Sequence, residues 1–63
     1  MPVISVELFE GRSRAQKKAF VEAVTRAAEE ILKTPREHVW ITFTDRPKSD
    51  WGIGGKLCDE PAG

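Results

Sequence analysis

Two short runs of alternating apolar residues, separated by one long amphipathic stretch, limit most strongly what this 63-residue chain can fold into. The runs cover residues 2–9 and 39–44, and alternation of this kind predicts a β-strand with one face on a core. Between them, apolar residues recur at helical spacing over about residues 14–33. A strand, a helix and a second strand predict a right-handed crossover with parallel pairing. The expected fold class is therefore α/β (α+β), a β-α-β protomer with a parallel two-stranded sheet.

Local signals mark the ends of these elements. Ser13 and Gln16 stand three residues apart, which is the spacing of a capping box at a helix start. A Thr-Pro pair at residues 34–35 stops the helix, and residues 45–50 have the composition of a turn. The glycine-rich residues 51–55 predict a short hairpin, or an arm that lies on a neighbouring chain.

The size of the chain predicts self-association. A single domain of residues 1–63 buries only about 60% of its unfolded surface, so disulfides, a metal or oligomerisation usually stabilise such a domain. Cys58 is the one cysteine, and together with His38 it offers too few ligands for a zinc site. A two-stranded sheet under one helix also leaves its other face and both edges open. We therefore expect a homo-oligomer without a metal.

Charge and hydropathy exclude several classes of partner. Ten basic and ten acidic residues cancel, so no net field attracts nucleic acid or an anionic membrane. The sequence has no transmembrane run, and its first residues lack the charged region of a signal peptide, which favours a cytoplasmic protein. The glycines at 52, 54 and 55 lack the strand-to-helix context of a phosphate-binding loop, so nucleotide binding is not expected.

Pro2 carries the clearest chemical meaning. Aminopeptidases remove an initiator methionine when the next residue is small, and the Pro2 nitrogen then becomes a secondary amine. An α-amino group ordinarily titrates near about 7.7–8.0, and burial or a neighbouring cation lowers that pKa. Such an amine is a free base at neutral pH, as proton abstraction from carbon requires. The alternative interpretation is that Pro2 only permits removal of Met1.

Three motifs in register resemble the 4-oxalocrotonate tautomerase family, and the resemblance spans essentially the whole chain. The motifs are Pro2 behind Met1, Gly11-Arg12-Ser13 before a helix with Gln16-Lys17, and Trp51-Gly52-Ile53-Gly54-Gly55. The resemblance implies dimers with a four-stranded sheet and two helices, usually joined as a hexamer of three dimers. It also implies catalysis without a metal or an organic cofactor.

The resemblance assigns roles to individual residues. Pro2 matches the family's catalytic base, and Arg12 matches the arginine that binds a substrate carboxylate and draws electrons. Trp51 matches an aromatic residue, usually Phe, in the apolar wall of the substrate pocket. The implied function is a tautomerase (isomerase) that moves a proton between enol and keto forms, 1,3 or 1,5, of a small unsaturated 2-hydroxy or 2-oxo acid.

One position departs from the family's pattern. The best-known members carry a second arginine on the second strand for the far end of a dicarboxylate, and Trp40 stands there in this chain. Trp40 is either a further part of the substrate-binding wall or an interface residue. Arg36 and Arg46 lie at the two ends of that strand and are candidates for the missing cation.

Two other functions remain open. A hydratase or dehalogenase acting on a substituted acrylate needs a carboxylate near the aromatic position, where Gly52 follows Trp51 and Asp50 is the only nearby acid. A non-enzymatic oligomer that has kept the fold is the second alternative. Retention of Met1 would favour it, because the Pro2 nitrogen would then be an amide.

Overall fold

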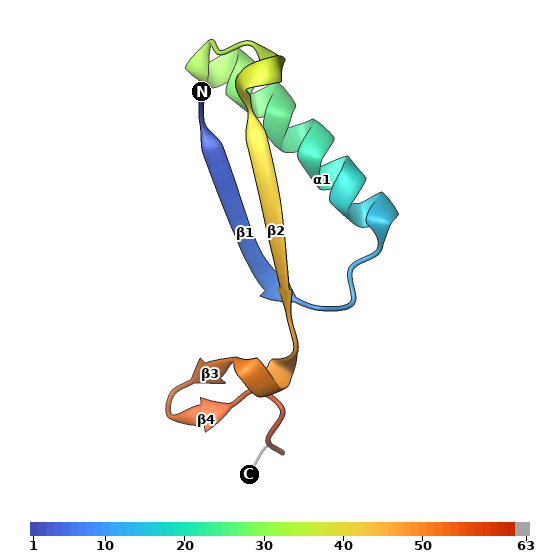
Figure 1. The fold of residues 1–63 in the computed structure, drawn as a ribbon, viewed down its shortest axis with the longest axis vertical. Coiled ribbons are helices and arrows are strands. Elements are labelled where there is room, and N and C mark those ends of the chain that lie inside the picture. Colours follow the sequence, from blue (N-terminus) through green and yellow to red (C-terminus); the bar gives the residue numbers. More distant parts are fainter. Residues whose placement is uncertain (62–63) are drawn as a thin grey trace.

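The computed structural model describes residues 1–61, and Figure 1 shows a β-α-β unit with a small hairpin at one end. Strands β1 (Val3–Phe9) and β2 (Trp40–Arg46) pair in parallel. Helix α1 (Arg14–Ala27) lies along one face of this sheet, where the rings of Phe20 and Phe43 meet edge to face at 6.1 Å. The predicted α/β (α+β) class, element order and parallel two-stranded sheet are confirmed.

A capping box marks the start of the helix, and a residue in the left-handed region marks its end. The Gln16 N–H donates to the Ser13 hydroxyl at 3.1 Å, and the Ser13 N–H donates to the Gln16 side chain at 2.9 Å. This is the predicted capping box, which satisfies two amides at the first turn. After α1 the chain continues as a π-helical turn (Ala28–Leu32), and Lys33 ends it in the left-handed region at φ 56°.

Strand β2 is longer than its alternating pattern predicts. The expectation of a turn over residues 45–50 is wrong for Asp45 and Arg46, which pair with the last two residues of β1. The Arg46 carbonyl also accepts a hydrogen bond from the Glu10 N–H at 3.0 Å. Pairing with β1 therefore outweighs the turn propensity of these residues. The turn itself is a single 3₁₀ turn, Lys48–Asp50.

The glycine-rich segment forms the predicted hairpin. Strands β3 (Gly52–Ile53) and β4 (Lys56–Leu57) pair antiparallel. Gly54 and Gly55, at φ 60° and 84°, make the two-residue turn that requires positive φ at both positions. The hairpin stands away from the β-α-β unit (Figure 1), and the radius of gyration is 15.3 Å. A compact chain of this length would have about 11 Å.

The protomer does not enclose a core of its own. Among the described residues only Ala28 is buried. Val3 and Trp40 are cross-strand neighbours and are 58% and 54% exposed, while Ile31 is 76% and Ile53 65% exposed. Exposed apolar surface on this scale marks contact with another molecule. Over residues 1–61 no helix has the length and apolar character needed to cross a membrane.

Candidate active site

The residues predicted to act on substrate lie at the two ends of the sheet. Pro2 immediately precedes β1, and Arg12 lies in the loop that follows it. The seven residues of β1 separate the two ends by roughly 20 Å, since a strand rises about 3.3 Å per residue. The structure therefore does not bring Pro2 and Arg12 together within one protomer.

Pro2 and Trp40 lie together at the first end. The Trp40 N–H donates to the Pro2 carbonyl at 3.1 Å, and Trp40 pairs with Val3 across the sheet. The Trp40 indole donates from Nε1 to the Glu37 carbonyl at 3.3 Å. This bond restrains the ring, although about half of the residue's surface stays exposed. The start of β2 therefore lies beside Pro2 through the backbone, while the Trp40 side chain shares the face of Val3, away from α1.

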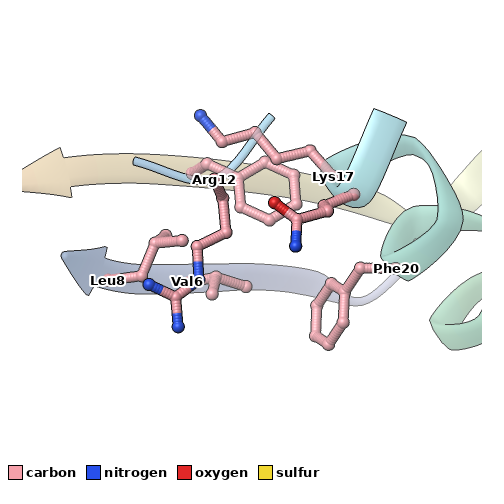
Figure 2. Close-up of a pocket in the computed structure, with 7 residues that line it drawn as sticks. Val6, Leu8, Arg12, Lys17 and Phe20 are labelled. Atoms are coloured by element: carbon pink, nitrogen blue, oxygen red, sulfur yellow. The ribbon is translucent and has the colours of Figure 1, made fainter. Parts of the chain in front are cut away.

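Arg12 lines a cavity of about 290 Å³ at the second end, between α1 and the sheet (Figure 2). Its wall is formed by Val6, Leu8, Arg12, Gln16, Lys17, Phe20 and Phe43. Figure 2 shows the Arg12 guanidinium reaching toward Val6 and Leu8, with Phe20 further along the helix. An apolar wall with a few polar groups is typical of a pocket for a small organic molecule. Here the polar groups are an amide and two cations, so the favoured ligand is an organic anion.

The two cations of this cavity differ in their partners. Lys17 Nζ lies 2.5 Å from Asp45 Oδ2 and 5.6 Å from the centre of the Phe43 ring. Its charge is therefore already balanced by a carboxylate. No ion pair involving Arg12 occurs within residues 1–61. Arg12 is consequently the cation of the cavity that remains available for a carboxylate ligand.

Trp51 shares the Arg12 end of the sheet but not its cavity. Its ring meets Phe9 edge to face, with 4.8 Å between centroids and 61° between planes. Phe9 follows Leu8 in β1, so the two side chains point to opposite faces of the sheet. Lys48 Nζ lies 5.7 Å from the centre of the Phe9 ring. Trp51 therefore belongs to a separate aromatic cluster on the face away from α1.

The two arginines near the ends of β2 are both paired with carboxylates. Arg36 Nη2 lies 3.1 Å from Glu29 Oε1, and this hydrogen bond, with the charge of Glu29, raises the pKa of Arg36. Arg46 Nε lies 2.7 Å from Glu7 Oε2. Arg46 lies at the end of β2 away from Pro2, and the charge of Arg36 is balanced by Glu29.

The sequence pattern did not identify most of the cavity wall. Leu8, Phe20 and Phe43 satisfy the rules for core positions, and these rules cannot distinguish a packed core from an apolar pocket. Lys17 was recognised only as part of the Gln16-Lys17 motif, without a role of its own. A usable signal was present, because Gln16 and Lys17 precede Phe20 by four and three residues and so share its helix face.

Comparison with known proteins agrees with this fold. The family model described as tautomerase enzyme matches residues 2–60. The chain is 46% identical over 60 residues to 2-hydroxymuconate tautomerase of Comamonas testosteroni, covering 95% of each. A solved 4-oxalocrotonate tautomerase isozyme of Methylibium petroleiphilum superposes with a TM-score of 0.83 at 42% identity, covering 90% of this chain and 92% of that one. A heterohexameric 4-oxalocrotonate tautomerase of Chloroflexus aurantiacus gives 0.87 at 28% identity, covering 95% and 97%. The chain therefore belongs to the 4-oxalocrotonate tautomerase family and is an isomerase of that type.

Proposed function

We propose that the protein ketonises a small unsaturated 2-hydroxy acid, with Pro2 as the general base and Arg12 as the substrate-binding cation. Membership of the family supports tautomerase activity in general. The observation that carries the residue assignment is the cavity beside Arg12, where a guanidinium without a carboxylate partner lies over an apolar wall. The described lining of this cavity contains no carboxylate that could activate water, which disfavours the hydratase alternative.

The reaction needs only proton transfer. The lone pair of the Pro2 amine takes the proton of the enol hydroxyl, and the electrons of the O–H bond form the carbonyl. The electrons of the carbon–carbon double bond then take the same proton from Pro2 at carbon, either adjacent or at the end of the conjugated system. Arg12 pairs with the carboxylate and stabilises the negative charge that develops on the neighbouring oxygen. The amine ends the cycle neutral, with no net change in oxidation state.

This site requires two copies of the chain, because Pro2 and Arg12 lie at opposite ends of β1. The sheet order β1-β2 leaves one edge of β1 open. Antiparallel pairing of two such edges about a twofold axis places Pro2 of one copy at the Arg12 end of the other, twice per dimer. Pairing through β2 would leave Pro2 one strand farther away. We extend this dimer to a hexamer of three dimers, with support from the solved heterohexameric relative.

The same arrangement sets the protonation of the base. The charge of Arg12 beside the amine favours the neutral form, so the pKa of Pro2 falls below the ordinary range of about 7.7–8.0. The apolar wall of the cavity acts in the same direction, since it disfavours a charged amine. A neutral Pro2 at physiological pH therefore depends on a cation from the other copy.

Mixing two inactive variants tests the shared site. Pro2→Leu should retain Met1 and turn the residue-2 nitrogen into an amide, whereas Arg12→Ala keeps the amine and removes the cation. Each variant refolded alone should be nearly inactive. Refolded together in equal amounts, they should regain roughly a quarter of wild-type activity, because about half of the dimers are mixed and each holds one intact site.

Two controls make this result decisive. Wild type carried through the same refolding sets the reference, and the two variants mixed after separate refolding show whether subunits exchange. Arg14→Ala is the matched control for Arg12→Ala, because Arg14 is an exposed arginine that does not line the cavity. If the co-refolded mixture stays inactive while wild type recovers, Pro2 and Arg12 do not act across copies.

A further inference from the structure

We infer that Lys17 is a positioning residue for the proposed reaction, because its ion pair with Asp45 keeps that carboxylate from pairing with the Arg12 guanidinium. The inference rests on the proposed function, since it states what leaves the cation of the site available to a substrate. Three observations carry it: the place of Asp45 beside the cavity, the direction of the Arg12 side chain and the fixed position of Lys17.

Asp45 lies beside the Arg12 cavity, although it is not part of the wall. It follows Phe43 by two residues in β2, so both side chains point to the face of the sheet that α1 covers. Its cross-strand neighbour is Leu8, a residue of the cavity wall. A partly exposed carboxylate therefore stands one strand away from the apolar wall over which a ligand would lie.

The Arg12 guanidinium reaches toward the same place. Figure 2 shows it directed at Val6 and Leu8. Adjacent strands lie about 4.8 Å apart, so a guanidinium near Leu8 is within reach of a carboxylate on the paired residue Asp45. A guanidinium binds a carboxylate through two parallel hydrogen bonds, a geometry that an ammonium cannot match. Asp45 would therefore be a suitable partner for Arg12 if no other cation occupied it.

Lys17 occupies Asp45 in this structure. Its Nζ lies 2.5 Å from Asp45 Oδ2 and 5.6 Å from the centre of the Phe43 ring, so the ammonium is held from two sides. The Lys17 N–H donates to the Ser13 carbonyl at 3.1 Å, which fixes its backbone at the capping box directly behind Arg12. The lysine thus balances the charge of a carboxylate that would otherwise compete with the substrate.

Loss of the Lys17 charge should therefore weaken substrate binding without slowing the bound complex. A freed Asp45 would pair with Arg12 in part of the molecules, and apparent affinity falls in proportion to the fraction that stays competent. Saturating substrate displaces Asp45, so kcat is retained while KM rises. A variant that had only lost structure would behave in the opposite way, because fewer active molecules lower kcat at constant KM.

Kinetics with phenylenolpyruvate, an enol acid with one carboxylate, test the inference. Lys17→Met in the protein with a free Pro2 should raise KM about three- to sixfold and keep kcat within about twofold. Lys17→Met combined with Asp45→Asn should recover most of the lost affinity, because the competing carboxylate is gone. Lys17→Arg should keep KM low, since it still pairs with Asp45. Lys18→Met, an exposed lysine outside the cavity, is the matched control and should leave KM unchanged.

Inhibitor binding separates pairing with Arg12 from simple repulsion of the ligand. Cinnamate, a flat acid with one carboxylate, is titrated by the quenching of tryptophan fluorescence. Lys17→Met should weaken its binding about three- to sixfold in the wild-type background. The same change should weaken it by less than about 1.5-fold in Arg12→Ala, where no guanidinium remains for Asp45 to bind. Direct repulsion by a freed Asp45 would weaken binding equally in both backgrounds.

The outcomes separate this inference from the proposed function. An unchanged KM in Lys17→Met, a loss that Asp45→Asn does not reverse, or equal losses of cinnamate affinity with and without Arg12 would each overturn the role of Lys17. A wild type with a free Pro2 that does not ketonise phenylenolpyruvate overturns the proposed function instead, and the cinnamate titration then still decides the role of Lys17. If Lys17→Met does not fold, Lys17→Gln replaces it in both measurements.

Discussion

The two ends of the β1–β2 sheet carry different chemical groups. The Pro2 end has a candidate base next to the start of β2, and Arg36, four residues before Trp40, pairs with Glu29. The Arg12 end has an available guanidinium over an apolar cavity. Because parallel strands start at one end and finish at the other, residues that precede and follow them separate in this way. Under the proposed function, the comparison teaches that base and cation are complementary halves, neither of which would form a site alone.

Removing the base should have the largest effect and would leave the Arg12 half intact. Pro2→Leu retains Met1, so the nitrogen at residue 2 becomes an amide without useful basicity. Loss of a general base costs about 10²–10⁴-fold in rate. The measurement is kcat for phenylenolpyruvate, with intact mass to confirm the N-terminus. Pro2→Ala is the matched control, because it still loses Met1 and keeps an N-terminal amine. Equal rates for wild type and Pro2→Leu would remove Pro2 from the mechanism.

Removing the cation should have the next largest effect. The pH dependence of kcat/KM also tests whether Arg12 lowers the pKa of Pro2. Arg12→Ala should lower kcat/KM by roughly 10²-fold, the scale for one group that stabilises a developing oxyanion. A cation beside an amine lowers its pKa, so its removal raises the pKa of Pro2. The acid limb of the kcat/KM profile should therefore move to higher pH.

Arg14→Ala, with its exposed side chain, serves as the control and should leave the limb in place. An unchanged limb in Arg12→Ala would mean that Arg12 does not stand beside Pro2 in the assembly. A shifted limb with an unchanged rate would confine Arg12 to setting the protonation of the base.

The smallest effect is expected from the cap that fixes the helix start behind Arg12. Ser13→Ala removes the hydroxyl that accepts from the Gln16 N–H, at a cost of about 1 kcal/mol in the free energy of unfolding. Denaturant unfolding at one fixed protein concentration measures it. Ser49→Ala, in an exposed turn without a side-chain cap, is the control and should be near neutral. Equal losses in both variants would show that the cap is not the cause.

Most of the fold could be predicted because its signals are local. Alternation and the pair Ser13–Gln16 act within a few residues, and both predictions are confirmed. Asp45 and Arg46 were assigned to a turn because their pairing partners lie far away in β1. Long-range pairing of this kind outweighs local propensity and leaves little trace in a single sequence.

The site was predicted only in part, for the same physical reason. Motifs mark Pro2, Arg12 and Trp51 as candidates, but they do not show which side chains balance the charge of a neighbouring residue, and the structure places Trp51 outside the Arg12 cavity. Lys17 pairs with Asp45 across 28 positions of sequence, and Arg46 pairs with Glu7 across 39. Such pairs decide which cations are available to a ligand. They follow from tertiary geometry, so a sequence pattern cannot supply them.

The near absence of buried residues has a consequence for how the chain reaches its native state. With only Ala28 buried among residues 1–61, one copy gains little by folding alone. In the proposed assembly, folding is coupled to encounter between chains, so the free energy of the native state depends on the total protein concentration. The amount of native protein then rises more steeply than the amount of chain made, since such an assembly is at least second order. When synthesis is slow, new chains spend longer with apolar surface exposed, and proteases act on that population.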